Sequence, residues 1–206
     1  MDSRLACICL AWIVAAYFVG AIPFGYLIGR MRGVDVRTVG SKNIGATNVY
    51  RTVGHGWGFL AFFCDFAKGL VPTLLASLYA ARHPGGGALA ANMPLCVGLA
   101  CVVGHTLTVF MRFKGGKGVA TAFGMFLALA PYPTLLAFAV FVLTVWLSHY
   151  ISLGSILAAV TLGAAIWLFP ATLPLRVVAD VIAVFVVVKH RTNIQRLAKG
   201  CENRIY

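Results

Sequence analysis

The stretch L-A-C-I-C-L-A-W-I-V-A-A-Y-F-V-G-A-I-P-F-G-Y-L-I, residues 5–28, contains no charged side chain. At about 1.5 Å per residue, a helix of this length exceeds the ~30 Å hydrocarbon core of a bilayer. Only Arg4 adds positive charge before the run, and no small-residue cleavage site follows it, so we expect a retained membrane span rather than a signal peptide. Pro23 and Gly25 are predicted kink sites.

The composition extends this expectation to the whole chain. Of 206 residues, 61% are hydrophobic and only 11% are charged, whereas a soluble domain carries about a quarter charged residues. We therefore expect an all-α polytopic membrane protein that forms a single domain over residues 1–206. The net charge of +12 fits an anionic leaflet and anionic ligands rather than nucleic acid. The six cysteines show no C-x-x-C spacing, so we interpret them as small membrane-buried hydrophobes without a metal or disulfide role.

Further apolar runs predict the other spans: 57–81, 88–110, 118–130, 134–147, 156–169 and 175–188. The 118–130 run would reach only roughly 20 Å as a helix, and Pro131 and Pro133 follow it. We interpret 118–130 and 134–147 as two short or tilted helices joined by a proline turn, and a single kinked span is the alternative. For the 156–169 span, a start a few residues earlier in the chain is the alternative.

The distribution of basic residues predicts the orientation. With the N-terminus outside and seven transmembrane helices, the segments 29–56, 112–117, 148–155 and 189–206 face the cytoplasm and hold thirteen of the seventeen Lys and Arg residues. This asymmetry is what the positive-inside rule expects. A six-span arrangement would place the basic C-terminal tail outside, so we expect a cytoplasmic C-terminus. No internal repeat supports an inverted-repeat transporter.

A first polar cluster, G-S-K-N-I-G-A-T-N-V-Y-R at residues 40–51, lies in the first predicted cytoplasmic loop. Its small residues let the backbone approach a ligand, its side chains offer many donors, and it contains no carboxylate. Such a segment suits a phosphate or another anion. The alternative is a solvated loop with ordinary positive-inside charge.

Three more polar clusters fall on the same predicted side. The second, F-K-G-G-K-G-V-A-T at residues 113–121, places Lys117 where a helix begins, which suits an anion, although it lacks the Walker A pattern and an ordinary flexible loop is the alternative. In the third, S-H-Y-I-S-L-G-S at residues 148–155, Ser152 or Ser155 either caps a helix or binds phosphate. The fourth, K-H-R-T-N-I-Q-R-L at residues 189–197, carries His190 and Asn193 on one helix face. We interpret Arg191 and Arg196 as interfacial lipid anchors.

Acidic residues are scarce: Asp2, Asp35, Asp65, Asp180 and Glu202 are the five in the chain. Metal-dependent phosphotransferases need several carboxylates at one site, so we expect no metal. Asp65 and Lys68 lie three residues apart inside a predicted span. An ion pair there is costly and often functional. The two residues either neutralise each other or brace the polar loops.

The four clusters, in this order and at these intervals, closely resemble the bacterial membrane acyl-phosphate:glycerol-3-phosphate acyltransferases, the PlsY family. The resemblance covers the chain from Pro23 to Glu202 and departs from the family at Gly154, where a serine is common. It implies an acyltransferase of phospholipid biosynthesis that moves a fatty acyl group from acyl phosphate to the 1-hydroxyl of sn-glycerol 3-phosphate. The products are lysophosphatidic acid and inorganic phosphate. No cofactor is implied, and the H-x-x-x-x-D motif of other glycerophosphate acyltransferases is absent.

This resemblance supplies the expected site. Lys117 and Arg51 would neutralise phosphate charge, and His190 or a substrate phosphate would accept the hydroxyl proton without an acyl-enzyme. The expected substrate-binding residues are Ser41, Asn43, Gly45, Thr47, Asn48, Gly115, Gly116, Gly118, Ser152, Ser155 and Asn193. We expect a monomer in the bacterial inner (cytoplasmic) membrane, surrounded by membrane lipids, with its active site at the cytoplasmic face. A phosphate transporter is the alternative, but the outer halves of the spans lack the polar path it needs.

Overall fold

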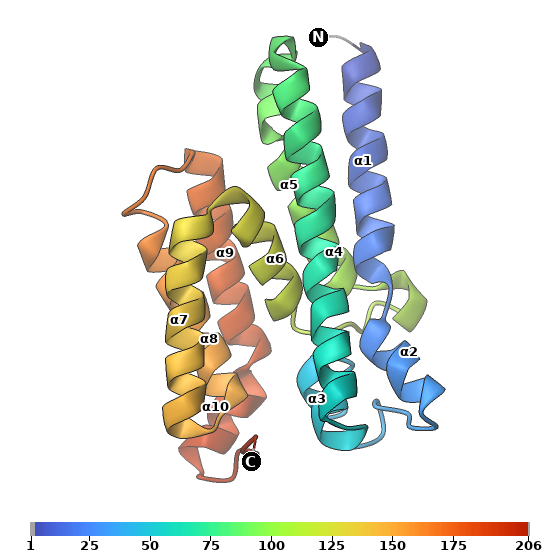
Figure 1. The fold of residues 1–206 in the computed structure, drawn as a ribbon, viewed down its shortest axis with the longest axis vertical. Helices are drawn as coiled ribbons and strands as arrows, with labels where there is room; N and C mark the ends of the chain where they lie inside the picture. The colour runs from blue at the N-terminus through green and yellow to red at the C-terminus, as the bar shows by residue number, and fades with distance from the viewer. Residues whose placement is uncertain (1–2, 206) are drawn as a thin grey trace. The chain divides into compact units, whose positions relative to one another are not determined.

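The computed structural model describes residues 3–205 of the chain. These residues are helical or irregular, with no β-strand among them. They divide into two compact units, one ending at Leu129 and the other beginning at Ala130. Figure 1 shows the helices of both units.

The first unit contains six α-helices: α1 (Ser3–Ala21), α2 (Phe24–Met31), α3 (Ala46–Thr52), α4 (His55–Arg82), α5 (Gly87–Thr106) and α6 (Val119–Leu129). Short 3-10 turns lie at Pro84–Gly86 and Val109–Met111. The predicted kink at Pro23 is a break, because α1 ends at Ala21 and α2 starts after the proline. Pro23 has no N–H group to continue the helical ladder.

Small residues allow close helix packing in the first unit. A Cβ added at Gly20 of α1 would overlap the Cys101 backbone, and one added at Gly104 of α5 would overlap the Tyr17 carbonyl. The buried core beside this contact consists of Cys9, Ala16, Ala76, Met93, Val97, Ala100 and Cys101. In a bilayer, helix association depends on this kind of close contact, since lipid is as apolar as leucine.

One of the two predicted polar loops of the first unit differs from the sequence prediction. Residues 29–56 were predicted as a loop, but they contain α3 and the last turn of α2. The α3 helix has only seven residues, too few for a periodic apolar pattern to be recognised. The predicted basic loop at residues 112–117 is confirmed between Met111 and Val119.

The second unit contains α7 (Pro131–Ser148), α8 (Ile151–Ala165), α9 (Leu173–Lys189) and α10 (Arg191–Ala198). The residues predicted at 118–130 and 134–147 form two separate helices, α6 and α7, as the preferred interpretation predicted. The alternative, a single kinked span, is wrong. The prolines do not form a turn between them, however: Pro131 begins α7, because a proline in the first helical turn removes no intrahelical hydrogen bond. The α8 helix begins at Ile151, five residues before the predicted 156–169 span.

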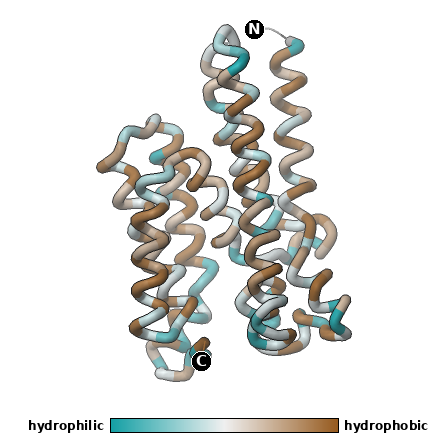
Figure 2. The backbone as a smooth tube through the Cα atoms, in the orientation of Figure 1, coloured by the Kyte–Doolittle hydropathy of each residue, from teal (hydrophilic) through white to brown (hydrophobic). Residues whose placement is uncertain are grey.

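The prediction of an all-helical integral membrane protein is confirmed. Among the described residues, four helical stretches are long and apolar enough to cross a membrane, namely Arg4–Met31, His55–Arg82, Pro84–Met111 and Pro131–Ser148, and α6 and α8 are shorter apolar helices. Figure 2 shows hydrophobic colour along α1 and α4 and hydrophilic residues in the segment that joins α2 to α3. Large apolar side chains such as Phe63, Leu78 and Trp146 are exposed, as expected for surfaces that lipid covers.

Candidate functional site

Asn48 holds the first polar cluster (residues 40–51) in shape. Its side chain is 1% exposed. The Oδ1 atom accepts a hydrogen bond from the Ser41 N–H at 2.8 Å, and Nδ2 donates to the carbonyl oxygens of Val36 at 2.8 Å and Val39 at 3.2 Å. Gly40 has φ +59, and a Cβ there would overlap Asn48 Oδ1. The amide therefore shapes this loop, and its predicted contact with substrate stays a prediction.

The other predicted residues of the first cluster lie nearer the surface. Ser41 is exposed, while Asn43, Gly45, Thr47 and Arg51 are half-buried. Asn43 Oδ1 accepts the Gly45 N–H at 2.7 Å, just before α3 begins. This bond leaves the donating amide nitrogen of Asn43 for other partners. Arg51 lies in the last turn of α3.

The second polar cluster (residues 113–121) lies against the end of α5. The Gly115 N–H donates to the Thr106 carbonyl at 3.2 Å, and the Gly116 N–H donates to the His105 carbonyl at 3.1 Å. A Cβ at Gly115 would overlap the His105 carbonyl, and Gly118 has φ +81, which favours glycine. These two N–H groups are thus used within the protein, and the predicted binding of substrate by Gly115, Gly116 and Gly118 stays a prediction.

The start of α6 supplies the remaining donors of the second cluster. The first intrahelical bond runs from the Ala122 N–H to the Gly118 carbonyl at 2.8 Å, so the N–H groups of residues 119–121 have no partner within the helix. Lys117 precedes them and is half-buried. A lysine beside the N-terminus of an 11-residue helix is chemically suited to an anion.

The α4 helix supports both clusters of the first unit. A Cβ at Gly58 would overlap Tyr50, the residue before Arg51. Further along α4, the Asp65 carbonyl accepts a hydrogen bond of 2.9 Å from the Thr121 hydroxyl, at the end of the second cluster. From Gly58 to Asp65 the rise along a helix is about 10 Å. One stretch of α4 therefore contacts Tyr50, the neighbour of Arg51, and Thr121 near the start of α6.

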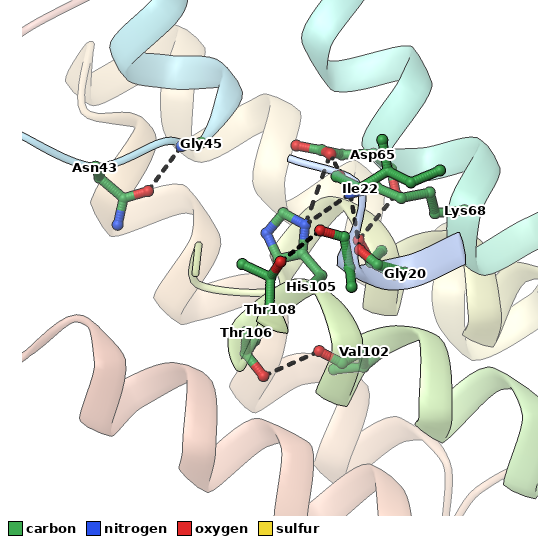
Figure 3. Close-up of polar contacts among 12 residues, drawn as sticks. Gly20, Ile22, Asn43, Gly45, Asp65, Lys68, Val102, His105, Thr106 and Thr108 are labelled. Atoms are coloured by element: carbon green, nitrogen blue, oxygen red, sulfur yellow. Dashed lines mark hydrogen bonds and ion pairs between the residues drawn. The ribbon is translucent and has the colours of Figure 1, made fainter. Parts of the chain in front are cut away.

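Asp65 and Lys68 form a buried ion pair in α4, and His105 of α5 joins them (Figure 3). Lys68 Nζ lies 2.8 Å from Asp65 Oδ1 and 3.3 Å from His105 Nδ1, and His105 Nδ1 lies 3.6 Å from Asp65 Oδ1. Lys68 Nζ also donates to the Gly20 and Ile22 carbonyls at 3.1 and 2.7 Å. Those carbonyls are available because the helix breaks at Pro23. We call Asp65, Lys68 and His105 the buried charge cluster.

In the second unit, Glu202 joins the third cluster (residues 148–155) to the fourth (residues 189–197). Its Oε1 accepts hydrogen bonds from Ser152 Oγ at 3.0 Å and Asn193 Nδ2 at 2.6 Å. Its Oε2 pairs with Arg196 Nε at 2.6 Å. Burial acts to raise the pKa of Glu202, but the hydrogen bonds from Arg196, Asn193 and Ser152 outweigh burial and hold this pKa below its ordinary value. The Arg196 guanidinium, predicted as a lipid anchor, thus pairs inside the unit.

The hydroxyls of the third cluster do not cap a helix. Tyr150 occupies the N-cap position of α8, so the capping interpretation of Ser152 and Ser155 is wrong. Ser155 Oγ donates back to the Ile151 carbonyl at 2.9 Å, within its own helix. Both serines are buried, and their predicted binding of phosphate stays a prediction.

His190 lies at the junction of α9 and α10 and is 3% exposed. Its Nδ1 lies 2.8 Å from the Val186 carbonyl. Because a carbonyl only accepts, this contact places the proton on Nδ1, and a neutral ring then bears its lone pair on Nε2. That is the tautomer a general base uses.

His105 and Glu202 contact the predicted site segments but were not predicted as site residues. His105 lies within an apolar run, where a single histidine gave no pattern. Glu202 was noted only as one of five acids. An isolated carboxylate in a basic tail is a signal that it has internal partners, and this signal was available in the sequence.

Comparisons with known proteins cover nearly the whole chain. A family model described as "Glycerol-3-phosphate acyltransferase" matches residues 10–200. Proteins of that name from Trichlorobacter lovleyi and Geobacter sulfurreducens are 49% and 51% identical to the chain, over 95% and 92% of it and 96% and 93% of their own lengths. Crystal structures of PlsY, an integral membrane glycerol 3-phosphate acyltransferase, match in the glycerol 3-phosphate form and the lysophosphatidic acid form. Their TM-scores are 0.86 and 0.83, at 39% and 38% identity, over 95% of this chain and 94% of each crystallised chain.

Proposed function

This chain belongs to the glycerol-3-phosphate acyltransferase family, and we propose that it acylates the 1-hydroxyl of sn-glycerol 3-phosphate with a fatty acyl group from acyl phosphate. The products are 1-acyl-sn-glycerol 3-phosphate (lysophosphatidic acid) and inorganic phosphate. The solved relatives are described in forms with glycerol 3-phosphate and lysophosphatidic acid, which supports the acceptor and the product. The donor is inferred from the motif resemblance.

The chemistry needs anion binding more than a strong protein nucleophile, because phosphate is a good leaving group. The hydroxyl oxygen attacks the acyl carbon, the new ester C–O bond forms, and the bond from the acyl carbon to the phosphate oxygen breaks. Lys117 and Arg51 stabilise the charge that develops on the leaving phosphate and the charge already present on the phosphate of the bound acceptor. Their half-buried positions strengthen this effect relative to a fully solvated charge.

The proton of the attacking hydroxyl goes to His190 Nε2 or to a phosphate oxygen of the substrates. The bond from Nδ1 to the Val186 carbonyl supports His190, because it fixes the tautomer with the basic nitrogen at Nε2. Asn193 and Ser152 are held by Glu202, which orients their remaining lone pairs and protons for polar groups of a substrate.

We further propose seven transmembrane helices, with the N-terminus outside and the C-terminus and active site at the cytoplasmic face. Counting α1 with α2 as one crossing, the others are α4, α5, α6, α7, α8 and α9. The distribution of thirteen basic residues in the resulting inside segments supports this orientation.

The test is acyl transfer by the purified protein reconstituted in lipid. Glycerol 3-phosphate is supplied with palmitoyl phosphate or with palmitoyl-CoA, and phosphate release and lysophosphatidic acid are followed together. We expect product with palmitoyl phosphate alone. Product only with palmitoyl-CoA would show that the donor is misassigned, and no product from folded protein with either donor would favour phosphate transport.

A further inference from the structure

We propose that the buried charge cluster of Asp65, Lys68 and His105 positions the glycine backbone of the second polar cluster, so that His105 is a positioning residue for phosphate binding. This inference rests on the proposed function only where it refers to substrate. None of the three residues belongs to the four polar clusters. Bracing of the polar loops was one of two interpretations of Asp65 and Lys68 from the sequence, and His105 had no predicted role.

The side chains of the buried charge cluster are held in place by their mutual contacts. Asp65, Lys68 and His105 are 2%, 3% and 6% exposed. Buried charges persist only when they are paired and hydrogen-bonded, and Lys68 meets this condition with Asp65, His105 and two backbone carbonyls. Lys68 Nζ and Asp65 Oδ1 lie 3.3 and 3.6 Å from His105 Nδ1, so the ion pair holds this edge of the ring in one orientation.

The opposite edge of the His105 ring meets the glycine loop. A Cβ added at Gly116 would overlap His105 Nε2, and its three nearest neighbours are all atoms of the His105 ring. The same histidine accepts the Gly116 N–H through its backbone carbonyl at 3.1 Å. Gly116 therefore packs on a single residue, whose side chain the buried ion pair orients.

The far end of the loop is held by the same helix turn. The Asp65 carbonyl accepts the Thr121 hydroxyl at 2.9 Å, and a Cβ at Gly69 would overlap the Thr121 carbonyl. The turn of α4 from Asp65 to Gly69 thus fixes both ends of the segment that carries Lys117. A shift of this segment by 1 Å would displace the lysine and the helix N–H groups from a bound phosphate.

Hydrogen exchange tests this inference without any substrate. His105→Asn leaves Asp65 and Lys68 to neutralise each other, so no buried charge loses its counter-ion, but it withdraws the ring from Gly116. We expect amide exchange in residues 113–121 to rise at least about tenfold, because local opening controls exchange. The matched control is His83→Asn, which changes an exposed histidine at the other end of α4 and should leave the loop unchanged. If His105→Asn does not fold, His105→Gln gives the same comparison.

A double-mutant cycle then tests the specific contact. Gly116→Ala places a methyl group against the His105 ring, and we expect KM for one of the two phosphate-bearing substrates to rise about tenfold or more while kcat changes less. In the double variant Gly116→Ala/His105→Asn, the shorter side chain at residue 105 accommodates the methyl group. The fold-increase in KM should therefore be smaller than the product of the fold-increases in the two single variants.

Unchanged loop exchange in a folded His105 variant, or strictly multiplicative KM effects, would overturn the inference. A general rise of exchange across α4 and α5 would also overturn it, since it would show a merely structural role. If the wild-type protein transfers no acyl group but the exchange result holds, the proposed function fails and the positioning of the loop stands.

Discussion

Lys117 is the residue on which the proposed phosphate chemistry most depends. We predict that Lys117→Ala lowers kcat/KM for acyl transfer by about 10- to 150-fold, because a hydrogen bond to a charged group is worth about 1.5–3 kcal/mol. Lys114→Ala is the matched control, since Lys114 lies in the same loop but is exposed. Steady-state kinetics with palmitoyl phosphate provide the measurement. A Lys117→Ala enzyme that keeps most of the wild-type rate would remove Lys117 from the mechanism.

Glu202 gives a prediction about pH. Its folded-state pKa is lowered, so its contribution to stability is present above the ordinary carboxyl pKa and is lost as pH falls through the folded value. Glu202→Gln removes the charge that faces Arg196, and we expect a loss of about 2 kcal/mol at pH 7. The loss should shrink as pH falls below the ordinary carboxyl pKa and through the lowered folded value, because wild-type Glu202 then becomes protonated as well.

Thermal unfolding in detergent from pH 7 to pH 3 measures this difference. Asp35→Asn is the control, because the Asp35–Arg37 pair is equally short at 2.6 Å but its side chains are 22% and 49% exposed. The pKa of Asp35 is lowered to about 2 by its hydrogen bonds with Arg37, yet solvent screens an exposed pair and reduces its value. An equal loss of stability in both variants at pH 7 would contradict the prediction that the buried Glu202 contributes more stability than the exposed Asp35.

Some contacts of individual residues could not be predicted from the sequence. The polar types at Asn48, Ser152 and Asn193 were recognised as donors for a ligand, but each has an internal partner in the fold. Sequence spacing indicates which groups share a loop or a helix face. It does not indicate that a carboxylate nine residues beyond Asn193 returns to accept its amide, because that contact depends on the turn after α10.

The contact between α4 and α6 depends on glycine. A Cβ at Gly69 would overlap the Thr121 carbonyl, and one at Gly124 would overlap the Phe66 carbonyl. We predict that Gly69→Ala destabilises the protein by about 1–3 kcal/mol, since the helices must separate to admit the methyl group. Gly56→Ala is the control in the same helix, because nothing lies within 4 Å of its added Cβ.

Thermal unfolding in detergent compares the two alanine variants. Gly56→Ala should be neutral or slightly stabilising, because alanine restricts the unfolded chain. Equal midpoints for Gly69→Ala and the wild-type protein would mean that α4 and α6 are not in close contact.

Helices were predictable where their apolar runs were long. The runs at 57–81 and 88–110 match α4 and α5 closely, since lipid-facing sequence needs no periodicity to be recognised. The seven-residue α3 was not predicted, and the eight-residue α10 was expected only as the helix face shared by His190 and Asn193. Helices this short are stabilised by tertiary contacts rather than by their own sequence, such as the contact between Tyr50 and Gly58 of α4.

At the scale of the whole chain, the proposed membrane orientation rests on the distribution of basic residues. Thirteen of seventeen basic residues fall on one side if the chain crosses seven times. A hydrophobic helix has no intrinsic direction, so this bias sets the orientation. In the proposed seven-helix topology all four polar clusters would face the cytoplasm, where soluble glycerol 3-phosphate is available.

Two single-cysteine variants test this topology. In a background without other cysteines, Gly85→Cys places a thiol in the exposed turn between α4 and α5, with nothing within 4 Å of its Cβ, and the native exposed Cys201 marks the C-terminal tail. We predict that a membrane-impermeant maleimide added to cells with a permeabilised outer membrane labels Gly85→Cys. Cys201 should react only after the inner membrane is opened, because the anionic cytoplasmic leaflet retains its basic neighbours. Labelling of both thiols from outside would require an even number of crossings between residue 85 and Cys201. It would also place the fourth polar cluster away from the cytoplasm. Labelling of Cys201 alone would reverse the orientation.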